Sequence, residues 1–244
     1  MGLSSNIIWH QTDFNGLRSI LKLKRFQYSY SLESIKWKSS RVDIAFPMIS
    51  FCDIPLSDIT EYLGKYGNYT IGLKRSWGKT VGVCPVWYRD KDAISLKTQM
   101  DSFRGIENKD PYSLSEEEMI LWQVVANTKN HEGELVKRKF SSYRFFDERE
   151  VRLVPSYAEL LSSKVKPFMK KEEYDEYKSN YGNSLISNMW ANFEYSDIAY
   201  IIYSNKRSSV IELFKGYDYE NIVFLSHKQV KEDIIGMSHN RVID

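Results

Sequence analysis

The segment 144–155 is the feature that most constrains what this chain can fold into, because it places charge inside an apolar pattern. Apolar residues near both of its ends predict a β-strand, which Pro155 terminates. Side chains alternate between the two faces of a strand, so we expect Glu148, Glu150 and Arg152 on one face. Neighbouring carboxylates repel each other and resist burial. The pattern therefore indicates either a functional site or an exposed ladder of ion pairs that includes Arg152.

Length and composition narrow the class of protein. The 244 residues predict a single domain, 1–244, and a net charge of +2 gives no strong electrostatic signal for nucleic acid binding. The two cysteines are too few for a disulfide framework and show no metal-ligand spacing, so we expect free thiols, no bound metal and a cytoplasmic location. No apolar run approaches the roughly 20 residues that span a membrane.

The N-terminal region contains a second group of candidate residues. A short strand ends at His10, and Thr12 follows it directly before a helix. Backbone N–H groups at the start of a helix suit phosphate or ribose oxygens. Phe51 lies in the apolar run 46–55, which predicts a buried strand. The polar and basic segment between them, 31–45, has no clear period and predicts a loop.

Tyrosines surround the turn at Gly67. Ser57 can cap a helix that reaches about Lys65, and a strand resumes after the turn. Aromatic rings of this kind pack in cores and also hold flat ligands. The tyrosines of this region are Tyr62, Tyr66 and Tyr69, of which Tyr66 and Tyr69 are the candidates for stacking on a flat ligand.

The remaining pattern predicts an α+β fold with core strands over about 6–155 and 198–225. Helical insertions are expected over about 91–127 and 156–190. Basic clusters lie at Lys22, Lys24 and Arg25, at Lys36, Lys38 and Arg41, and at 137–139. Such runs are typical of solvated surfaces.

Three stretches, 46–57, 66–73 and 145–155, resemble the AbiGi-like family of bacterial abortive-infection proteins. The strings that carry the resemblance are Phe51-Cys52-Asp53-Ile54-Pro55-Leu56 and Asp147-Glu148-Arg149-Glu150. A wider resemblance is to ADP-ribosyltransferases, including the DarT-like toxins that modify nucleic acids. That family has a His or Arg at the end of its first strand and a Glu on a late strand. His10 and Glu150 match these positions, whereas the Ser-Thr-Ser of the middle motif has no counterpart here.

This resemblance implies an ADP-ribosyltransferase-like split β-sheet core with helical insertions. It also implies an NAD-dependent mono-ADP-ribosyltransferase toxin of a phage-defence system. In this hypothesis Glu150 stabilises an oxocarbenium-like state and Glu148 orients or deprotonates the acceptor. NAD is the substrate, and the residues expected to hold it are His10, Thr12, Tyr62, Tyr66, Tyr69 and Phe51.

The acceptor is expected to be RNA or DNA, with a protein as the second choice. Cations that would contact it are Lys36, Lys38, Arg41 and Arg152. An active toxin of this class implies a cognate antitoxin protein as partner. The alternative is a non-catalytic antitoxin or interaction module, which retains the fold, binds a partner protein and leaves NAD unchanged.

Overall fold

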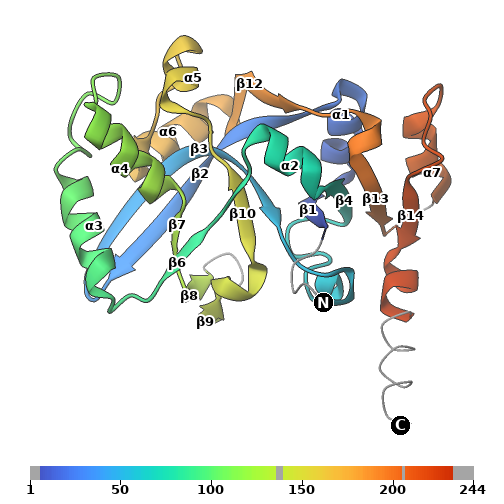
Figure 1. The fold of residues 1–244 in the computed structure, drawn as a ribbon, viewed down its shortest axis with the longest axis horizontal. Helices are drawn as coiled ribbons and strands as arrows, with labels where there is room; N and C mark the ends of the chain where they lie inside the picture. Colours follow the sequence, from blue (N-terminus) through green and yellow to red (C-terminus); the bar gives the residue numbers. More distant parts are fainter. Residues whose placement is uncertain (1–5, 136–139, 205–206, 233–244) are drawn as a thin grey trace, which may run out of the picture. The chain divides into compact units, whose positions relative to one another are not determined.

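A computed structural model describes residues 6–135, 140–204 and 207–232. The chain forms two compact units, of which unit 1 comprises 1–26, 51–81 and 191–244, and unit 2 comprises 27–50 and 82–190. Helices and mostly antiparallel strands occur in both units, so the predicted α+β class is confirmed (Figure 1). That the whole chain acts as one domain stays a prediction.

Strand β1 (Ile7–Thr12) lies inside the sheet of unit 1. It pairs antiparallel with β4 (Tyr69–Lys74) on one side and with the end of β3 (Ser40–Cys52) on the other. Next to β4 lie β13 (Ile198–Tyr203), which is antiparallel to it, and β14 (Val223–Ser226), which is parallel to β13. β4 thus has neighbours on both edges, and every residue of it except Lys74 is buried.

Helix α1 (Phe14–Leu23) follows β1 directly. The side chain of Asp13 accepts a hydrogen bond from Gly16 N at 2.7 Å, which caps the first turn. The helix ends at Lys24, whose φ of 48° is left-handed. Further helical elements of unit 1 are η1 (Leu56–Glu61), α2 (Arg75–Val81), η4 (Tyr195–Asp197), α7 (Arg207–Ile211) and η5 (Glu212–Phe214), and residues 227–232 are also helical.

The helix predicted from Ser57 to about Lys65 is shorter than expected, because the structure has only the 3-10 helix η1 there. Gly64 and Gly67 both have positive φ and turn the chain toward β4. At Gly67 a Cβ atom would lie 2.1 Å from the backbone oxygen of Thr12, so only glycine permits this approach.

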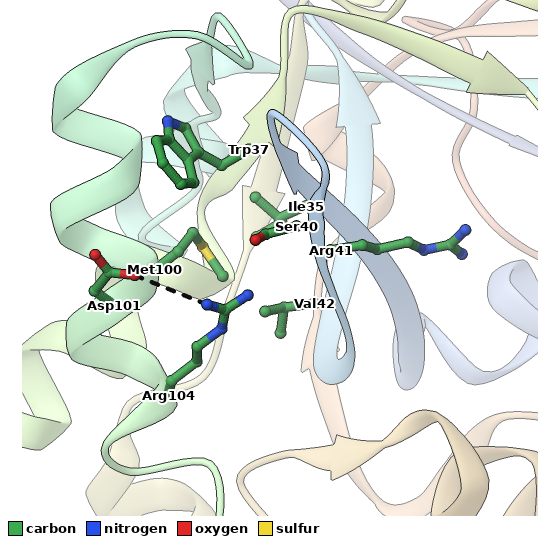
Figure 2. A pocket seen from close by; sticks show the side chains of 8 residues that line it. All are labelled: Ile35, Trp37, Ser40, Arg41, Val42, Met100, Asp101 and Arg104. Carbon is green, nitrogen blue, oxygen red and sulfur yellow. Dashed lines mark ion pairs between the residues drawn. The ribbon is translucent and has the colours of Figure 1, made fainter.

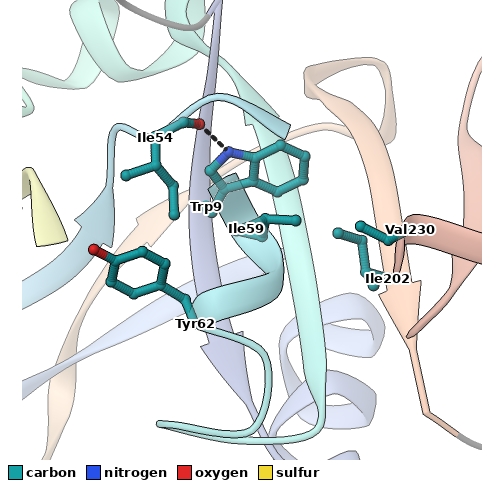
Figure 3. Packing of buried hydrophobic residues seen from close by; sticks show 6 residues of the cluster. All are labelled: Trp9, Ile54, Ile59, Tyr62, Ile202 and Val230. Atoms are coloured by element: carbon teal, nitrogen blue, oxygen red, sulfur yellow. Dashed lines mark hydrogen bonds between the residues drawn. The ribbon is translucent and has the colours of Figure 1, made fainter. Parts of the chain in front are cut away.

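The core of unit 1 is organised around Trp9 (Figure 3). Its Nε1 donates a hydrogen bond to the backbone oxygen of Ile54 at 2.8 Å, which satisfies the polar atom of a buried indole. The residues packed in this cluster are Trp9, Ile54, Ile59, Tyr62, Ile202 and Val230. Val230 belongs to the helical residues 227–232, so this last described segment is joined to the core.

Unit 2 is built on a long hairpin of β2 (Arg25–Trp37) and β3, paired from Ser29↔Met48 to Trp37↔Ser40. The loop predicted for 31–45 is therefore wrong. Alternate residues of the hairpin, including Ile35 and Ile44, are buried, but a buried Glu33 interrupts the apolar pattern and hides it in the sequence.

Two helices, α3 (Ile94–Arg104) and α4 (Glu116–Ala126), pack against this hairpin (Figure 1). The ring of Phe46 on β3 lies 6.2 Å from that of Phe103 and 6.1 Å from that of Trp122. A capping box at Ser115 begins α4, as the acidic residues after it predict. These aromatic contacts form the core of unit 2.

The segment 156–190, predicted to be helical, contains helices, the short strand β11 (Met169–Lys170) and most of a second strand. Helices α5 (Tyr157–Ser162) and α6 (Lys171–Tyr181) are present, but β12 (Leu185–Asn192) follows them, so the prediction is wrong for its last residues. The other strands of unit 2 are β5 (Cys84–Pro85), β6 (Trp87–Arg89), β7 (Thr128–Asn130), β8 (Glu132–Leu135), β9 (Phe140–Arg144), β10 (Glu150–Leu153) and β11 (Met169–Lys170). No helix in the described part of the chain is long and apolar enough to cross a membrane.

Candidate functional site

The two candidate glutamates do not share a strand. Glu150 begins β10 (Glu150–Leu153), whereas Glu148 ends the 3-10 helix η3 (Phe145–Glu148). Between them Arg149 adopts a left-handed conformation with φ of 43°. The prediction that both carboxylates lie on one strand face by alternation is therefore wrong. A turn, rather than the period of a strand, determines how they are placed.

Both oxygens of Glu150 are occupied by donors from within unit 2. Oε1 accepts hydrogen bonds from Ser50 Oγ and Arg152 Nε, each at 2.8 Å. Oε2 accepts from Lys129 Nζ at 2.8 Å and from Arg152 Nη2 at 3.1 Å. A carboxylate offers about four acceptor positions, so these contacts use the whole capacity of the group.

Arg152 joins Glu150 to the hairpin. Its Nη2 also donates to Glu33 Oε1 at 2.7 Å, and its Nη1 donates to the backbone oxygen of Ala126 at 2.8 Å. The Arg152 side chain is 0% exposed. An exposed ladder of ion pairs is therefore wrong for this segment, and Arg152 has no accessible surface to offer an acceptor.

Glu148 and two tyrosines complete the group. Glu148 Oε2 lies 3.5 Å from Lys129 Nζ, and its Oε1 accepts a hydrogen bond from the hydroxyl of Tyr143 at 2.9 Å. The backbone N–H of Glu150 donates to the hydroxyl of Tyr88 at 2.8 Å. We call these residues the Glu150 cluster: Glu33, Ser50, Tyr88, Lys129, Tyr143, Glu148, Glu150 and Arg152.

Electrostatics keep Glu150, Lys129 and Arg152 ionised. Burial alone would raise the pKa of Glu150, but Arg152 and Lys129 outweigh burial and hold that pKa below its usual range. Burial would lower the pKa of Lys129, but Glu150 and Glu33 hold it above its usual value. Glu33 differs, because its burial raises its pKa more than Arg152 and Lys129 lower it. A carboxylate held ionised by two cations is a weak base, so this chemistry suits a structural ion pair better than proton transfer.

Sequence reasoning missed five members of the cluster, namely Glu33, Ser50, Tyr88, Lys129 and Tyr143, and two of these are charged. Lys129 lies on the short strand β7, and Glu33 lies in the segment that was expected to be a loop. In the sequence, charge is the one property that could have indicated either residue as part of a site, and neither residue lies near Glu150. In the described ranges, no group of three or more His, Cys, Asp or Glu side chains could hold a metal ion.

The predicted cofactor-binding residues all lie in unit 1, whereas both predicted catalytic glutamates lie in unit 2. Within unit 1, the ring of His10 lies 5.6 Å from that of Phe51 and 5.0 Å from that of Phe26. Thr12 pairs with Tyr69 across the β1–β4 ladder. The fold thus brings His10 to Phe51 and Thr12 to Tyr69, inside the sheet.

The candidate stacking rings are mostly packed. Phe51 and Tyr69 are buried, and Tyr62 belongs to the cluster around Trp9. Tyr66 is 50% exposed, and its backbone N–H donates to Gln11 Oε1 at 3.2 Å. Among the predicted stacking tyrosines, only Tyr66 therefore offers a substantial surface to a flat ligand.

Three of the four cations predicted to contact an acceptor, Lys36, Lys38 and Arg41, lie near the end of the β2–β3 hairpin. Lys36 Nζ is 3.3 Å from Glu134 Oε2, and Arg41 Nε is 2.7 Å from Asp43 Oδ1. Lys38 lies over the ring of Trp37, with Nζ 5.2 Å from its centroid. These contacts neutralise Lys36 and Arg41 locally.

A shallow groove adjoins the same hairpin (Figure 2). Arg104 and Asp101 on α3 line it and form an ion pair, with Nη1 and Oδ1 3.8 Å apart. Figure 2 shows Arg41 extending away from Arg104. The basic cluster at 137–139 lies outside the described residues.

Comparison with known proteins gives one match. A family model described as "Putative abortive phage resistance protein AbiGi, antitoxin" matches residues 24–204. No curated protein and no solved structure matches the chain. The matched residues include every member of the Glu150 cluster.

This match bears out the AbiGi-like resemblance and gives no support to the DarT-like one. It also overturns the expected function, because an antitoxin family takes the place of the predicted ADP-ribosylating toxin. Catalysis on NAD, and NAD as a substrate, are tested by none of these observations and stay predictions.

Proposed function

Because this chain belongs to the AbiGi family of abortive phage resistance antitoxins, we propose that it is the antitoxin of a toxin–antitoxin pair and neutralises a cognate toxin by binding it. The expected partner is then a toxin rather than the antitoxin that the sequence predicted. Binding without chemistry was the alternative that the sequence left open.

The state of Glu150 is the structural observation that supports a binding role. Its side chain is 8% exposed, and Ser50, Lys129 and Arg152 occupy both of its oxygens. A ribose hydroxyl could reach this carboxylate only by displacing Ser50 Oγ or one of the two cations, and displacing a cation would weaken its charge compensation in a buried site. In a binding protein the same contacts have a sufficient purpose, because they join β10 to the hairpin of unit 2.

The proposal keeps the ADP-ribosyltransferase-like split sheet as an expectation. In this role the strands of each unit form a scaffold that presents loops and helices to a partner, and a preorganised surface favours affinity because little conformational entropy is lost on binding.

Growth assays test the proposal directly. The chain is expressed alone and together with the product of the adjacent gene. That product is also expressed beside a frameshifted copy of the chain's gene, which supplies no functional chain. We expect normal growth with the chain alone, arrest with the neighbour alone, rescue by the intact chain and copurification of the two proteins. Growth arrest by the chain alone, relieved by Glu150→Gln, would contradict the proposal.

An NAD assay separates binding from catalysis. The purified chain is incubated with NAD, and free nicotinamide is measured against buffer and against Glu150→Gln. We expect the same background release in all three. Release by the unmodified chain alone would restore an enzymatic role.

A further inference from the structure

Unit 1 contains a pocket of about 360 Å³ that the proposed function does not use. Ligand pockets commonly have volumes of about 300–1,000 Å³, so this one can hold a side chain or a small ligand. We call it the tyrosine pocket, and the lining residues that matter are Lys24, Glu194, Tyr195, Tyr217, Asp218 and Tyr219.

The tyrosine rings that line the tyrosine pocket pack against one another and against neighbouring phenylalanine rings. The rings of Tyr195 and Tyr217 meet edge to face with centroids 4.8 Å apart. Phe214, which is fully buried, lies 5.2 Å from Tyr195 and 5.9 Å from Tyr219. The ring of Phe224 also lies 5.9 Å from that of Tyr219. These contacts stabilise the positions of the rings that line the pocket.

The wall already holds one cation of the chain itself. Lys24 Nζ lies 5.0 Å from the ring centroid of Tyr195 and 5.4 Å from that of Tyr217. It also lies 2.9 Å from Glu194 Oε2. The backbone oxygen of Lys24 accepts a hydrogen bond from Phe193 N at 3.0 Å, which anchors the residue. Tyrosine faces beside a carboxylate thus form a surface that suits an ammonium group.

The charges around the pocket favour a further cation. Lys24 and Glu194 neutralise each other, and Asp218 adds one more negative charge, so one cation and two carboxylates leave the lining at −1. Asp218 is exposed and lies in the turn between Tyr217 and Tyr219. An anionic ligand would meet this excess negative charge, whereas a cation would compensate it.

We propose that the tyrosine pocket binds an arginine side chain of a partner protein. The planar guanidinium stacks on tyrosine rings and forms forked hydrogen bonds with a carboxylate, here Asp218. The identity of the partner rests on the proposed function, under which the arginine belongs to the toxin. The pocket's preference for a guanidinium is independent of that function.

A small-molecule titration tests this preference without any toxin. The 15N-labelled chain is titrated with N-acetyl-arginine methylamide and, separately, with its neutral isostere N-acetyl-citrulline methylamide. We expect amide shifts at residues 194–196 and 217–222, with citrulline at least about tenfold weaker, because only arginine carries the charge. Absence of shifts, equal binding of both compounds, or the same shifts with inorganic phosphate would overturn the proposal.

Variants then locate the contact. Tyr217→Ala and Asp218→Asn should each weaken arginine binding by about threefold to tenfold, and Tyr217→Phe should retain it because the ring remains. Tyr181→Ala is the matched control, since Tyr181 is a 66% exposed tyrosine of unit 2. Unchanged affinity in both Tyr217→Ala and Asp218→Asn would contradict the proposed contact.

A toxin-binding assay separates this inference from the proposed function. Weaker toxin binding by Asp218→Asn supports both. Equal toxin binding by the variant and the unmodified chain overturns the link between pocket and toxin, and the antitoxin role stands. Arginine binding without any toxin binding overturns only the proposed function.

Discussion

Each unit contains a lysine–glutamate pair beside aromatic rings, and the two pairs differ in solvation rather than in geometry. In unit 2, Lys129 Nζ and Glu150 Oε2 are 2.8 Å apart, with side chains 16% and 8% exposed. In unit 1, Lys24 Nζ and Glu194 Oε2 are 2.9 Å apart, with side chains 35% and 70% exposed. Both lysines also approach a ring, that of Phe145 at 4.7 Å and that of Tyr195 at 5.0 Å.

The difference indicates what each pair can do. A buried charge that loses its partner is left without compensation by water, so every member of the Glu150 cluster depends on the others. An exposed pair can exchange its partner for water or for a ligand at little cost. Unit 2 therefore has the chemistry of a scaffold, and the tyrosine pocket of unit 1 has that of an adaptable binding surface.

The largest effect should follow from Arg152→Met. The variant removes the cation that joins Glu33 to Glu150, and the buried carboxylates lose compensation. We expect a loss of about 3–5 kcal/mol in the free energy of unfolding, measured by urea denaturation. Arg144→Met is the matched control, because Arg144 is 60% exposed and 3.6 Å from Asp147, and should cost less than about 1 kcal/mol.

Arg152→Lys keeps the test decisive if Arg152→Met does not accumulate as folded protein. Lysine keeps the charge and loses the fork, so an intermediate loss of stability is expected. A loss in Arg152→Met no larger than that in Arg144→Met would show that burial does not distinguish the two regions.

An intermediate effect is expected from pH. The lowered pKa of Glu150 means that its contribution to stability is present above the unfolded value of about 4.3 and is lost as pH falls below it. We expect the unfolding free energy, measured by urea denaturation, to decrease by on the order of 2 kcal/mol as the pH is lowered from about 5 to about 3. Glu33, whose pKa is raised, acts in the opposite direction and reduces the net fall.

Comparison with Glu150→Gln isolates the contribution of Glu150 to this pH dependence of the unfolding free energy. The variant cannot titrate at position 150, so its unfolding free energy should fall less steeply in the same acid range. Parallel curves for the two proteins would contradict the assignment of the acid dependence to Glu150.

The sequence predicted those elements whose pattern is local. The strand at 46–52, the helices at 94–104 and 116–126, and the burial of Phe51 all follow from neighbouring residues. The hairpin over 31–45 could not be predicted in this way. Its inward-facing Glu33 reads as polar until Arg152, 119 residues away, is known to lie against it.

The candidate site shows the same limit. Glu150 was recognised as unusual within a strand, and its strand is present. The role of Glu150 depends on Lys129 and Ser50, which lie 21 and 100 residues away in the sequence. It also depends on the left-handed conformation of Arg149, which the sequence does not indicate because the residue is neither glycine nor asparagine. Residue types thus indicated where charge is unusual, whereas only the packing determined whether that charge is available.

The smallest effect should follow from Lys24→Met, compared with Lys129→Met. Removing Lys24 leaves Glu194 in water, so we expect a change within about 1 kcal/mol in unfolding free energy. Removing Lys129 leaves Glu150 and Glu148 buried with one cation fewer, and we expect a loss several times larger. Urea denaturation at low and high salt checks both. The Lys24 contribution should shrink at high salt because exposed pairs are screened, and that of Lys129 should persist. Equal losses of unfolding free energy in the two variants, or equal salt dependence of those losses, would contradict the expectation that the buried pair contributes more to stability than the exposed pair.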